Sequence, residues 1–234
     1  MPSTPVNAAE LFKGPTKTVG NPMLRYIFAN DLSDYPRLAA GMFRDRADQF
    51  SRRLGWAVDV DAVGEERDQY DAFNPLYVIW EGPRGEHHGS MRLMPTTGPT
   101  MINDHFSHLS RNGPVKSADI WECTRFCLTP GAGTRVAATL ILGGGEVLHG
   151  LGFRNYIGVF DSRMIRIYNA IGWSPVTIGT MGEGRSRICA GVWSYTETER
   201  YNVAARAWVS PAAAQLWLRR ANICNRIDGA QKAA

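Results

Sequence analysis

The order of its apolar segments constrains the fold of this chain more than any other feature of the sequence. Strand-like runs dominate the first half, and helical patterns then alternate with further strands. This order is typical of a sheet covered by helices. We therefore predict an α/β (α+β) fold with a mixed sheet. The expected strands are residues 24–28, 76–80, 89–94, 120–128, 156–160 and 187–193, and the expected helices are residues 35–54, 134–149, 162–171 and 212–227.

Length and composition fit a single domain. The chain has 234 residues, of which 44% are hydrophobic and 21% charged, enough for one substantial core. Residues 1–22 are rich in Pro, Gly and Thr, so we expect a flexible N-terminal arm before one domain over residues 23–234. No apolar run approaches the length of a membrane span.

Charge and cysteine content argue against several function classes. The formal net charge is +4, and the basic residues are spread along the chain, which is weaker than a nucleic-acid-binding signature. The four cysteines show no paired CxxC spacing, so neither a zinc site nor a disulfide framework is indicated. We therefore expect reduced cysteines and a cytoplasmic protein.

Three consecutive glycines, Gly143 to Gly145, interrupt the predicted helix over residues 134–149. Each glycine inside a helix costs about 1 kcal/mol relative to alanine. Such a cost predicts that this helix packs closely against a neighbour, or that it is shorter than residues 134–149.

Two opposite charges, Glu122 and Arg125, lie inside the strand-like run ADIWECTRFC. In a regular strand, side chains three positions apart point to opposite faces of the sheet. A β-bulge would turn one of them to the other face, and bulges are common beside active sites. The alternative is a surface salt bridge, or charges that protect an edge strand from aggregation.

A cation and two aromatic rings are expected at the end of the first predicted helix. Arg46 and Phe50 are four residues apart on one helix face, and Trp56 follows shortly after. The ordinary alternative is a core aromatic ring with a solvated arginine nearby.

The acidic loop over residues 57–75 is too long for a simple connection. Its Asp68 and Asp71 are candidates to receive a cationic ligand or to hold arginines in place, although a solvated acidic loop is also consistent with the pattern. Arg92 lies in the middle of a predicted strand among apolar neighbours, where an unpaired charge would be costly.

Four motifs occur in a fixed order: FRDRADQFSRRLGW, ERDQYD, MRLMPTTGPTMINDHF and WECTRF. In this order and at these separations, the chain resembles the acyl-homoserine lactone synthases of the autoinducer-synthase family, over about Leu24 to Trp193. The residues that match the family's invariant set are Arg46, Phe50, Trp56, Asp68, Asp71, Arg92, Phe106, Glu122 and Arg125.

The resemblance implies a fold similar to that of the GNAT N-acetyltransferases. That fold has three layers, in which helices flank a mixed, twisted sheet with a V-shaped splay at its centre. The strand that corresponds to residues 120–128 then carries a bulge and lines the cleft that binds the thioester.

The resemblance also implies a reaction that makes a quorum-sensing signal. S-adenosylmethionine would be a co-substrate, and an acyl thioester of acyl carrier protein or coenzyme A would be the acyl donor. The amine attacks the thioester, and the carboxylate of the product then closes on its own Cγ and expels methylthioadenosine. No permanently bound cofactor is implied.

Residue roles follow from the same resemblance. Glu122 is the first candidate for the base that deprotonates the amine, and Asp68 is the second. Arg125 completes the implied catalytic set. The residues implied to bind S-adenosylmethionine or to shape its pocket are Arg46, Phe50, Trp56, Asp71, Arg92 and Phe106.

Four histidines, His87, His88, His105 and His108, invite comparison with a metal site. Neither a carboxylate nor a cysteine at ligand spacing completes a ligand set with them, and the implied chemistry requires no metal. We therefore expect no metal ion.

The acyl donor is only partly constrained. Family members that make 3-oxo products tend to carry Thr in the strand that here reads YIGVFD, and its absence favours an unsubstituted, branched or aryl chain. The glycines of the turn TPGAGTR would suit a pyrophosphate, whereas the basic Lys116, Arg135 and Arg154 would suit an acidic carrier protein. The sequence does not choose between these donors.

Two other functions compete with this one. A GNAT-like acyltransferase would acylate a different amine without lactonisation. A non-catalytic relative would only bind S-adenosylmethionine or an acyl carrier, but it would have no reason to retain both Glu122 and Asp68.

Overall fold

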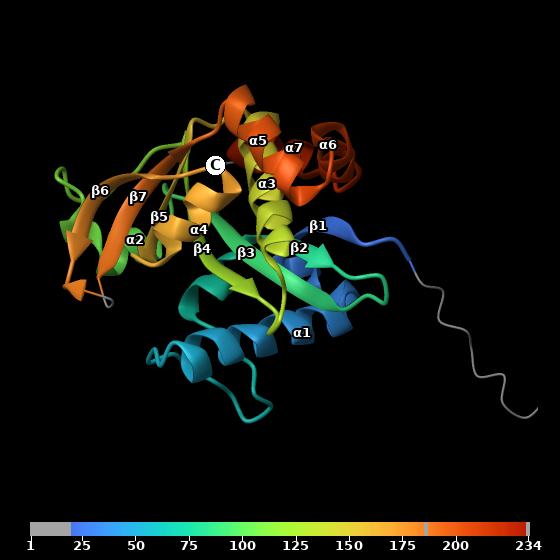
Figure 1. Cartoon of the computed structure of the whole chain (residues 1–234), viewed down its shortest axis with the longest axis horizontal. Coiled ribbons are helices and arrows are strands. Elements are labelled where there is room, and N and C mark those ends of the chain that lie inside the picture. The colour runs from blue at the N-terminus through green and yellow to red at the C-terminus, as the bar shows by residue number, and fades with distance from the viewer. Residues whose placement is uncertain (1–19, 185–186, 233–234) are drawn as a thin grey trace, which may run out of the picture.

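The computed structural model describes residues 20–184 and 187–232, and its strands form one mixed, twisted sheet (Figure 1). The seven strands follow the order β1-β2-β3-β4-β5-β7-β6. Every neighbouring pair is antiparallel except β4 and β5, which are parallel. The strands are β1 (Met23–Phe28), β2 (Leu76–Glu81), β3 (His87–Pro95), β4 (Ile120–Leu128), β5 (Asn155–Asp161), β6 (Val176–Met181) and β7 (Ile188–Ser194).

Helices cover both faces of this sheet, as the sequence predicts (Figure 1). The α-helices are α1 (Pro36–Arg46), α2 (Met101–His105), α3 (Thr134–Leu151), α4 (Met164–Ile171), α5 (Glu197–Ala207), α6 (Pro211–Arg220) and α7 (Ile223–Lys232). A π-helical segment, η3 (Ala47–Arg53), continues α1, and three short 3-10 helices are η2 (Ala29–Asp34), η4 (Gln69–Phe73) and η5 (Ser107–Leu109).

The central strand β2 shows why two helical layers are needed, because it is apolar on both faces. Tyr77 and Ile79 pack toward α1 with Met42, whereas Leu76 and Val78 face the opposite side. That opposite side carries α3 and α6, and α5 packs on α3 (Figure 1). The three-layer arrangement with a mixed sheet is therefore confirmed.

The sheet opens where β4 meets β5. These strands pair only from Ile120 to Glu122 on β4 and from Asn155 to Ile157 on β5. Beyond this point β4 continues to Leu128 without pairing to β5. The V-shaped splay is thus present, and it leaves a wedge between the second halves of the two strands.

A bulge in β4 lies at the same place. Ser90 pairs with Cys127 and Arg92 with Thr124, so β4 has one residue more than β3 in this interval. Arg125 adopts a left-handed backbone conformation with φ of 51°. The extra residue turns Arg125 onto the face of the sheet that also carries Thr124 and Glu122. Glu122 and Arg125, which would point to opposite faces of a regular strand, therefore lie on the same face.

The three glycines of α3, which are unfavourable inside a helix, pack closely against neighbouring side chains. This is the first of the two arrangements that the sequence predicts. A Cβ atom on Gly143 would lie 2.9 Å from Val78, and one on Gly144 would lie 3.0 Å from the Met91 sulfur. All three are buried inside an intact helix. The helix therefore lies on the sheet at a distance that larger residues would prevent.

Gly145→Ala should lower the free energy of unfolding by about 1–3 kcal/mol, since overpacking forces neighbours to shift. The added Cβ would lie 2.2 Å from the Tyr195 ring. Gly144→Ala is the matched control, because its nearest neighbour is the flexible Met91 thioether. Urea unfolding of both variants measures the difference, and an equal loss in the two would contradict close packing at Gly145.

Some elements differ from the sequence-based expectation. The helix predicted over residues 35–54 becomes π-helical after Arg46, and that over residues 212–227 is interrupted at Asn222, which has a φ of 53°. The edge strand β6 and the helix α5 were not predicted, because β6 is mostly exposed and α5 is strongly polar. Most of the arm predicted over residues 1–22 lies outside the described residues, so it stays a prediction.

Candidate active site

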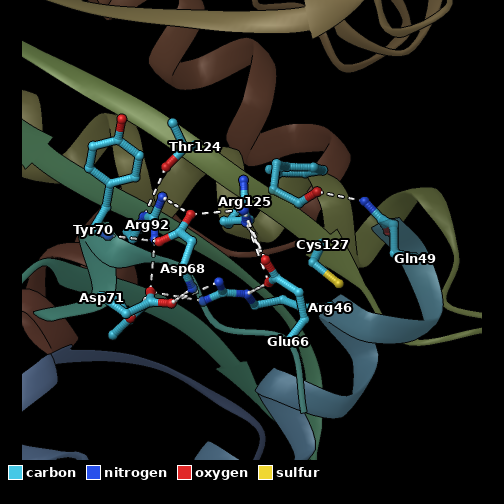
Figure 2. A network of polar contacts seen from close by, with 12 residues as sticks. Arg46, Gln49, Glu66, Asp68, Tyr70, Asp71, Arg92, Thr124, Arg125 and Cys127 are labelled. Atoms are coloured by element: carbon cyan, nitrogen blue, oxygen red, sulfur yellow. Dashed lines mark hydrogen bonds and ion pairs between the residues drawn. The ribbon is translucent and has the colours of Figure 1, made fainter. Parts of the chain in front are cut away.

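Three arginines and three carboxylates form a closed ring of alternating charge next to the β4 bulge (Figure 2). Each arginine contacts two carboxylates, and each carboxylate contacts two arginines. We call this set the ion-pair ring; in order around it, the members are Arg46, Glu66, Arg125, Asp68, Arg92 and Asp71.

The distances in the ion-pair ring are those of strong, charge-assisted hydrogen bonds. Arg46 donates its Nε to Glu66 over 2.5 Å and uses both terminal nitrogens on Asp71, over 3.0 and 2.9 Å. Arg92 binds both oxygens of Asp68, over 2.5 and 2.9 Å, and reaches Asp71 over 2.8 Å. These two arginines are fully buried, so their hydrogen bonds to the carboxylates of the ring replace the hydrogen bonds to water that they lose on folding.

The ion-pair ring controls the ionisation of its own members. Burial acts to raise the pKa of Asp71, but the guanidinium groups of Arg46 and Arg92 outweigh it and hold that pKa well below its usual range. The hydroxyl of Tyr77 also donates to Asp71 over 2.5 Å. Asp71 is therefore a permanent anion of the site.

The acidic loop supplies its carboxylates in a fixed local geometry. Asp68 caps the short helix η4 by accepting from the Tyr70 backbone N–H over 3.0 Å, and Asp71 accepts from the Asp68 N–H over 2.9 Å. This capping box orients both carboxylates toward the arginines. The acidic loop over residues 57–75 is thus tied to the arginines of the sheet by its carboxylates.

Sequence reasoning missed Glu66, which is fully buried and joins Arg46 to Arg125. It also missed Gln49 of η3, which binds the strand next to the bulge. The Gln49 side chain donates to the Phe126 carbonyl over 2.7 Å and accepts from the Leu128 N–H over 3.2 Å. The motif GEERD contains the signal for Glu66, but its two adjacent glutamates cannot be ranked without the structure.

Glu122 lies apart from the ion-pair ring and is fully buried. Its carboxylate accepts hydrogen bonds from the backbone N–H groups of Met101 and Ile102, over 3.0 and 2.5 Å, at the start of α2. Burial raises its pKa to about 7, although these two hydrogen bonds act in the opposite direction. Glu122 is therefore a carboxyl group that can exchange a proton near neutral pH.

A cavity of about 650 Å³ fills the wedge between β4 and β5. Cys123 to Phe126 form one wall, and Tyr156 with residues 158–161 forms the other. The predicted site residues that line it are Phe50, Trp56, Phe106 and Arg125. The remaining five lie behind this lining: Arg46, Asp68, Asp71 and Arg92 in the ion-pair ring, and Glu122 behind Met101.

The predicted cluster of a cation with two aromatic rings exists, but its cation is different. The rings of Phe50 and Trp56 stack with their centroids 5.3 Å apart. The guanidinium over Phe50 belongs to Arg125, at 5.3 Å, whereas Arg46 lies 5.1 Å from the Phe43 ring. The expectation for Arg46 was wrong because its carboxylate partners draw the guanidinium away from Phe50.

Comparison with known proteins identifies the family. The family model described as autoinducer synthase matches residues 32–203, which span all nine predicted site residues. The chain belongs to the autoinducer synthase family. An acyl-homoserine-lactone synthase of Rhizobium etli is 40% identical over 181 residues, which cover 74% of this chain and 85% of the relative. The resemblance to these acyltransferases is thereby confirmed.

Solved structures of autoinducer synthases share the fold. The coenzyme A-dependent acyl-homoserine lactone synthase MesI is 25% identical, with a TM-score of 0.70 over 80% of this chain and 96% of MesI. BjaI, whose structure contains S-adenosylmethionine and isopentyl-coenzyme A, has a TM-score of 0.73 over 87% of this chain and all of BjaI; at 22% identity it supports the fold alone.

Among the described residues, two further findings bear on function. No helix there is both long and apolar enough to cross a bilayer. No three side chains of the metal-binding types His, Cys, Asp and Glu are grouped to hold a metal ion in that part of the chain.

Proposed function

We propose that this autoinducer synthase transfers an acyl group from a thioester to the amine of S-adenosylmethionine. Lactonisation then releases methylthioadenosine and leaves an acyl-homoserine lactone, a quorum-sensing signal. The observation that carries the proposal is the cavity at the β4–β5 splay, which combines an apolar interior with the charged Arg125 and the ion-pair ring at one side. An apolar chain and a charged co-substrate fit such a cavity together.

Phe50, Trp56, Phe106 and Arg125 are the residues that would contact S-adenosylmethionine. Aromatic faces attract a sulfonium cation, and the stacked pair Phe50–Trp56 lines the cavity beside Arg125. Arg46, Asp71 and Arg92 would act indirectly, by holding Arg125 and Asp68 in position. A related synthase, TofI, has been solved in a ternary complex with an inhibitor and methylthioadenosine.

Trp56→Ala should weaken S-adenosylmethionine binding by about tenfold, since cation–π contacts contribute roughly 1–2 kcal/mol. Trp56 is 38% exposed, so the fold should tolerate the change. Isothermal titration calorimetry measures the affinity, with Phe73→Ala as the control because Phe73 is exposed and does not line the cavity. Unchanged affinity would mean that Trp56 only packs on Phe50.

Glu122 is the better candidate for the base. Both carboxylate oxygens of Asp68 are engaged by Arg92, Arg125 or the Tyr70 N–H, which favours a role in orienting the arginines. Glu122 has a pKa of about 7 and binds the N–H of Met101, a cavity residue. A water molecule between this group and the amine would complete the proton path.

The bulge of β4 would stabilise the tetrahedral oxyanion. It interrupts the β3–β4 ladder at Arg125, on the wall of the cavity, and a backbone N–H that the bulge takes out of the ladder would donate to a substrate oxygen there. Lactonisation then depends mainly on orientation of the carboxylate against Cγ.

The two candidate acyl donors are thioesters of coenzyme A and of acyl carrier protein. Arg135 lies in the first turn of α3, and Arg154 follows the last residue of α3 by three positions. An 18-residue helix is about 27 Å long, so these two and Lys116 form no single docking patch. MesI is described as coenzyme A-dependent. We therefore propose acyl-coenzyme A as the first donor to test, and the cytoplasm, where such thioesters are made, as the location.

Mass spectrometry of the purified protein with S-adenosylmethionine and a panel of acyl-coenzyme A and acyl-carrier-protein donors tests the function. Matched lactone and methylthioadenosine would support it. Acylated product without methylthioadenosine would make the protein an ordinary N-acyltransferase, and the absence of both with every donor would favour the binding module.

A further inference from the structure

Aromatic side chains wall the inner part of the cavity. They come from β5, α4, β7 and the loop after α4, and adjacent rings meet at centroid distances of 5.2 to 6.3 Å. The members of this aromatic wall are Tyr156, Phe160, Tyr168, Trp173 and Trp193. Such a wall suits the body of an acyl chain, but four of its five members, all except Phe160, also carry a polar atom that needs a partner.

The backbone satisfies two of those polar atoms. The Tyr156 hydroxyl donates to the Gly144 carbonyl over 2.9 Å, and the Trp173 indole N–H donates to the Ser194 carbonyl over 2.6 Å. These two residues therefore present only their apolar surfaces to a ligand.

Tyr168 differs from both. It is 92% buried, since only 8% of its surface is exposed, and it lines the cavity. Among residues 20–184 and 187–232, no atom forms a hydrogen bond with its hydroxyl. Its ring is fixed by edge contacts with Phe160 at 5.4 Å and Trp193 at 5.2 Å, so the hydroxyl is held in place without a protein partner.

The hydroxyl oxygen of Tyr168 is not among the fully enclosed polar atoms that lack a partner, so its remaining exposure is to the cavity that the residue lines. Burial raises its pKa, with a further contribution from the Cys123 thiol on β4, which lies on the opposite cavity wall. On the β5 wall itself, Gly158 and Val159 line the cavity and offer no hydroxyl. Among the described residues that line the cavity, the Tyr156 hydroxyl is bound to Gly144 and the Thr124 hydroxyl accepts from Arg92 over 3.0 Å, which leaves the Tyr168 hydroxyl for the acyl chain.

We propose that Tyr168 is a specificity-determining residue that hydrogen-bonds a hydroxyl or keto oxygen on the acyl chain of the donor. The inference rests on the proposed function, because it assigns the chain to this cavity. A hydroxyl that is exposed only to an apolar cavity has few partners there, and a ligand oxygen would supply one. The proposal departs from the unsubstituted chain that the absence of Thr from residues 156–161 favours.

The test compares wild type with Tyr168→Phe on matched acyl-coenzyme A donors. Each unsubstituted donor, hexanoyl, octanoyl or dodecanoyl, is paired with its 3-oxo, 3-hydroxy and terminal-hydroxy derivatives. Wild type should favour at least one oxygenated derivative by roughly 5- to 100-fold in kcat/KM, and Tyr168→Phe should bring that ratio close to one. Tyr156→Phe is the control, because its hydroxyl is engaged by Gly144 and its loss should leave the ratio unchanged.

Calorimetric binding of the same donors separates this inference from the proposed function. If no donor releases methylthioadenosine, the proposed function fails, and the ratio of affinities still tests Tyr168. If lactone forms but no oxygenated donor is preferred over its parent, or if Tyr168→Phe keeps the preference, the inference about Tyr168 is overturned. In that case a water molecule is the partner of the hydroxyl.

Discussion

Arg46→Met should lower the free energy of unfolding by about 3–5 kcal/mol, because it breaks a buried ion pair and leaves its partners uncompensated. Arg46 is the fully buried link between Glu66 and Asp71. Its loss would leave the ion-pair ring with two arginines for three carboxylates. The methionine fills most of the space, so the change is mainly one of charge. Urea unfolding measures the loss as a lower midpoint at unchanged slope.

Arg52→Met is the matched control. Arg52 follows in η3 and pairs with Asp48 one turn earlier, but its side chain is 69% exposed. Exposed pairs of this kind contribute less than about 1 kcal/mol. A loss at Arg46 no larger than that at Arg52 would mean that the ion-pair ring contributes nothing to stability beyond ordinary surface charges.

The sequence predicts the sheet well and the ion-pair ring poorly, for a physical reason. Strands such as β2 and β4 carry their own signal, since apolar residues at strand spacing have few other structures to form. The partners in the ring come from segments as far apart as Arg46 and Arg125. The pairing of carboxylates with arginines depends on how the loop over residues 57–75 packs on the sheet. No local sequence pattern predicts this packing.

The bulge at Arg125 is an intermediate case. The opposite charges of Glu122 and Arg125 in one strand indicate an irregularity in that strand. The resemblance to the family identifies the irregularity as a β-bulge. Only the register of β3 against β4 and the φ of 51° at Arg125 show how the backbone achieves it. The wrong cation was expected beside Phe50 for the same reason. Helix spacing identifies Arg46, which lies on α1, but it cannot identify Arg125, which lies on β4.

The bulge and the ion-pair ring also depend on each other. A left-handed conformation at a residue other than glycine is unfavourable and persists only where its surroundings enforce it. Glu66 and Asp68 hold the Arg125 guanidinium on one side, and Gln49 binds the strand just beyond it. The acidic loop and η3 thereby keep open the wedge in which both substrates would meet.

Glu122→Gln should reduce turnover by about 10²–10⁴-fold, the usual contribution of a general base. The amide has the same shape, and its oxygen can still accept from the N–H of Ile102. S-adenosylmethionine affinity should therefore change little, since Glu122 does not line the cavity. Release of methylthioadenosine under saturating substrates measures turnover, and Asp68→Asn provides the comparison with the second candidate.

The pH dependence identifies the proton acceptor. Glu122 must be ionised to act as a base, so with a pKa of about 7 the wild-type kcat should rise with pH below 7 and level off above it. The same raised pKa means that the native state binds more protons than the unfolded chain between about pH 4.3 and 7. Stability should consequently fall as pH rises through this window, and Glu122→Gln should remove that slope.

The pH dependence of kcat and the pH dependence of stability together distinguish a catalytic base from a structural carboxylate. If Glu122→Gln abolishes the stability slope but retains near-normal turnover with an unchanged kcat profile, Glu122 only caps α2. The remaining profile would then report the amine of S-adenosylmethionine, because α-amino groups titrate at about pH 8. If turnover and the acid limb near pH 7 are lost together, the proton passes to Glu122, and the burial that raises its pKa is part of the catalytic design.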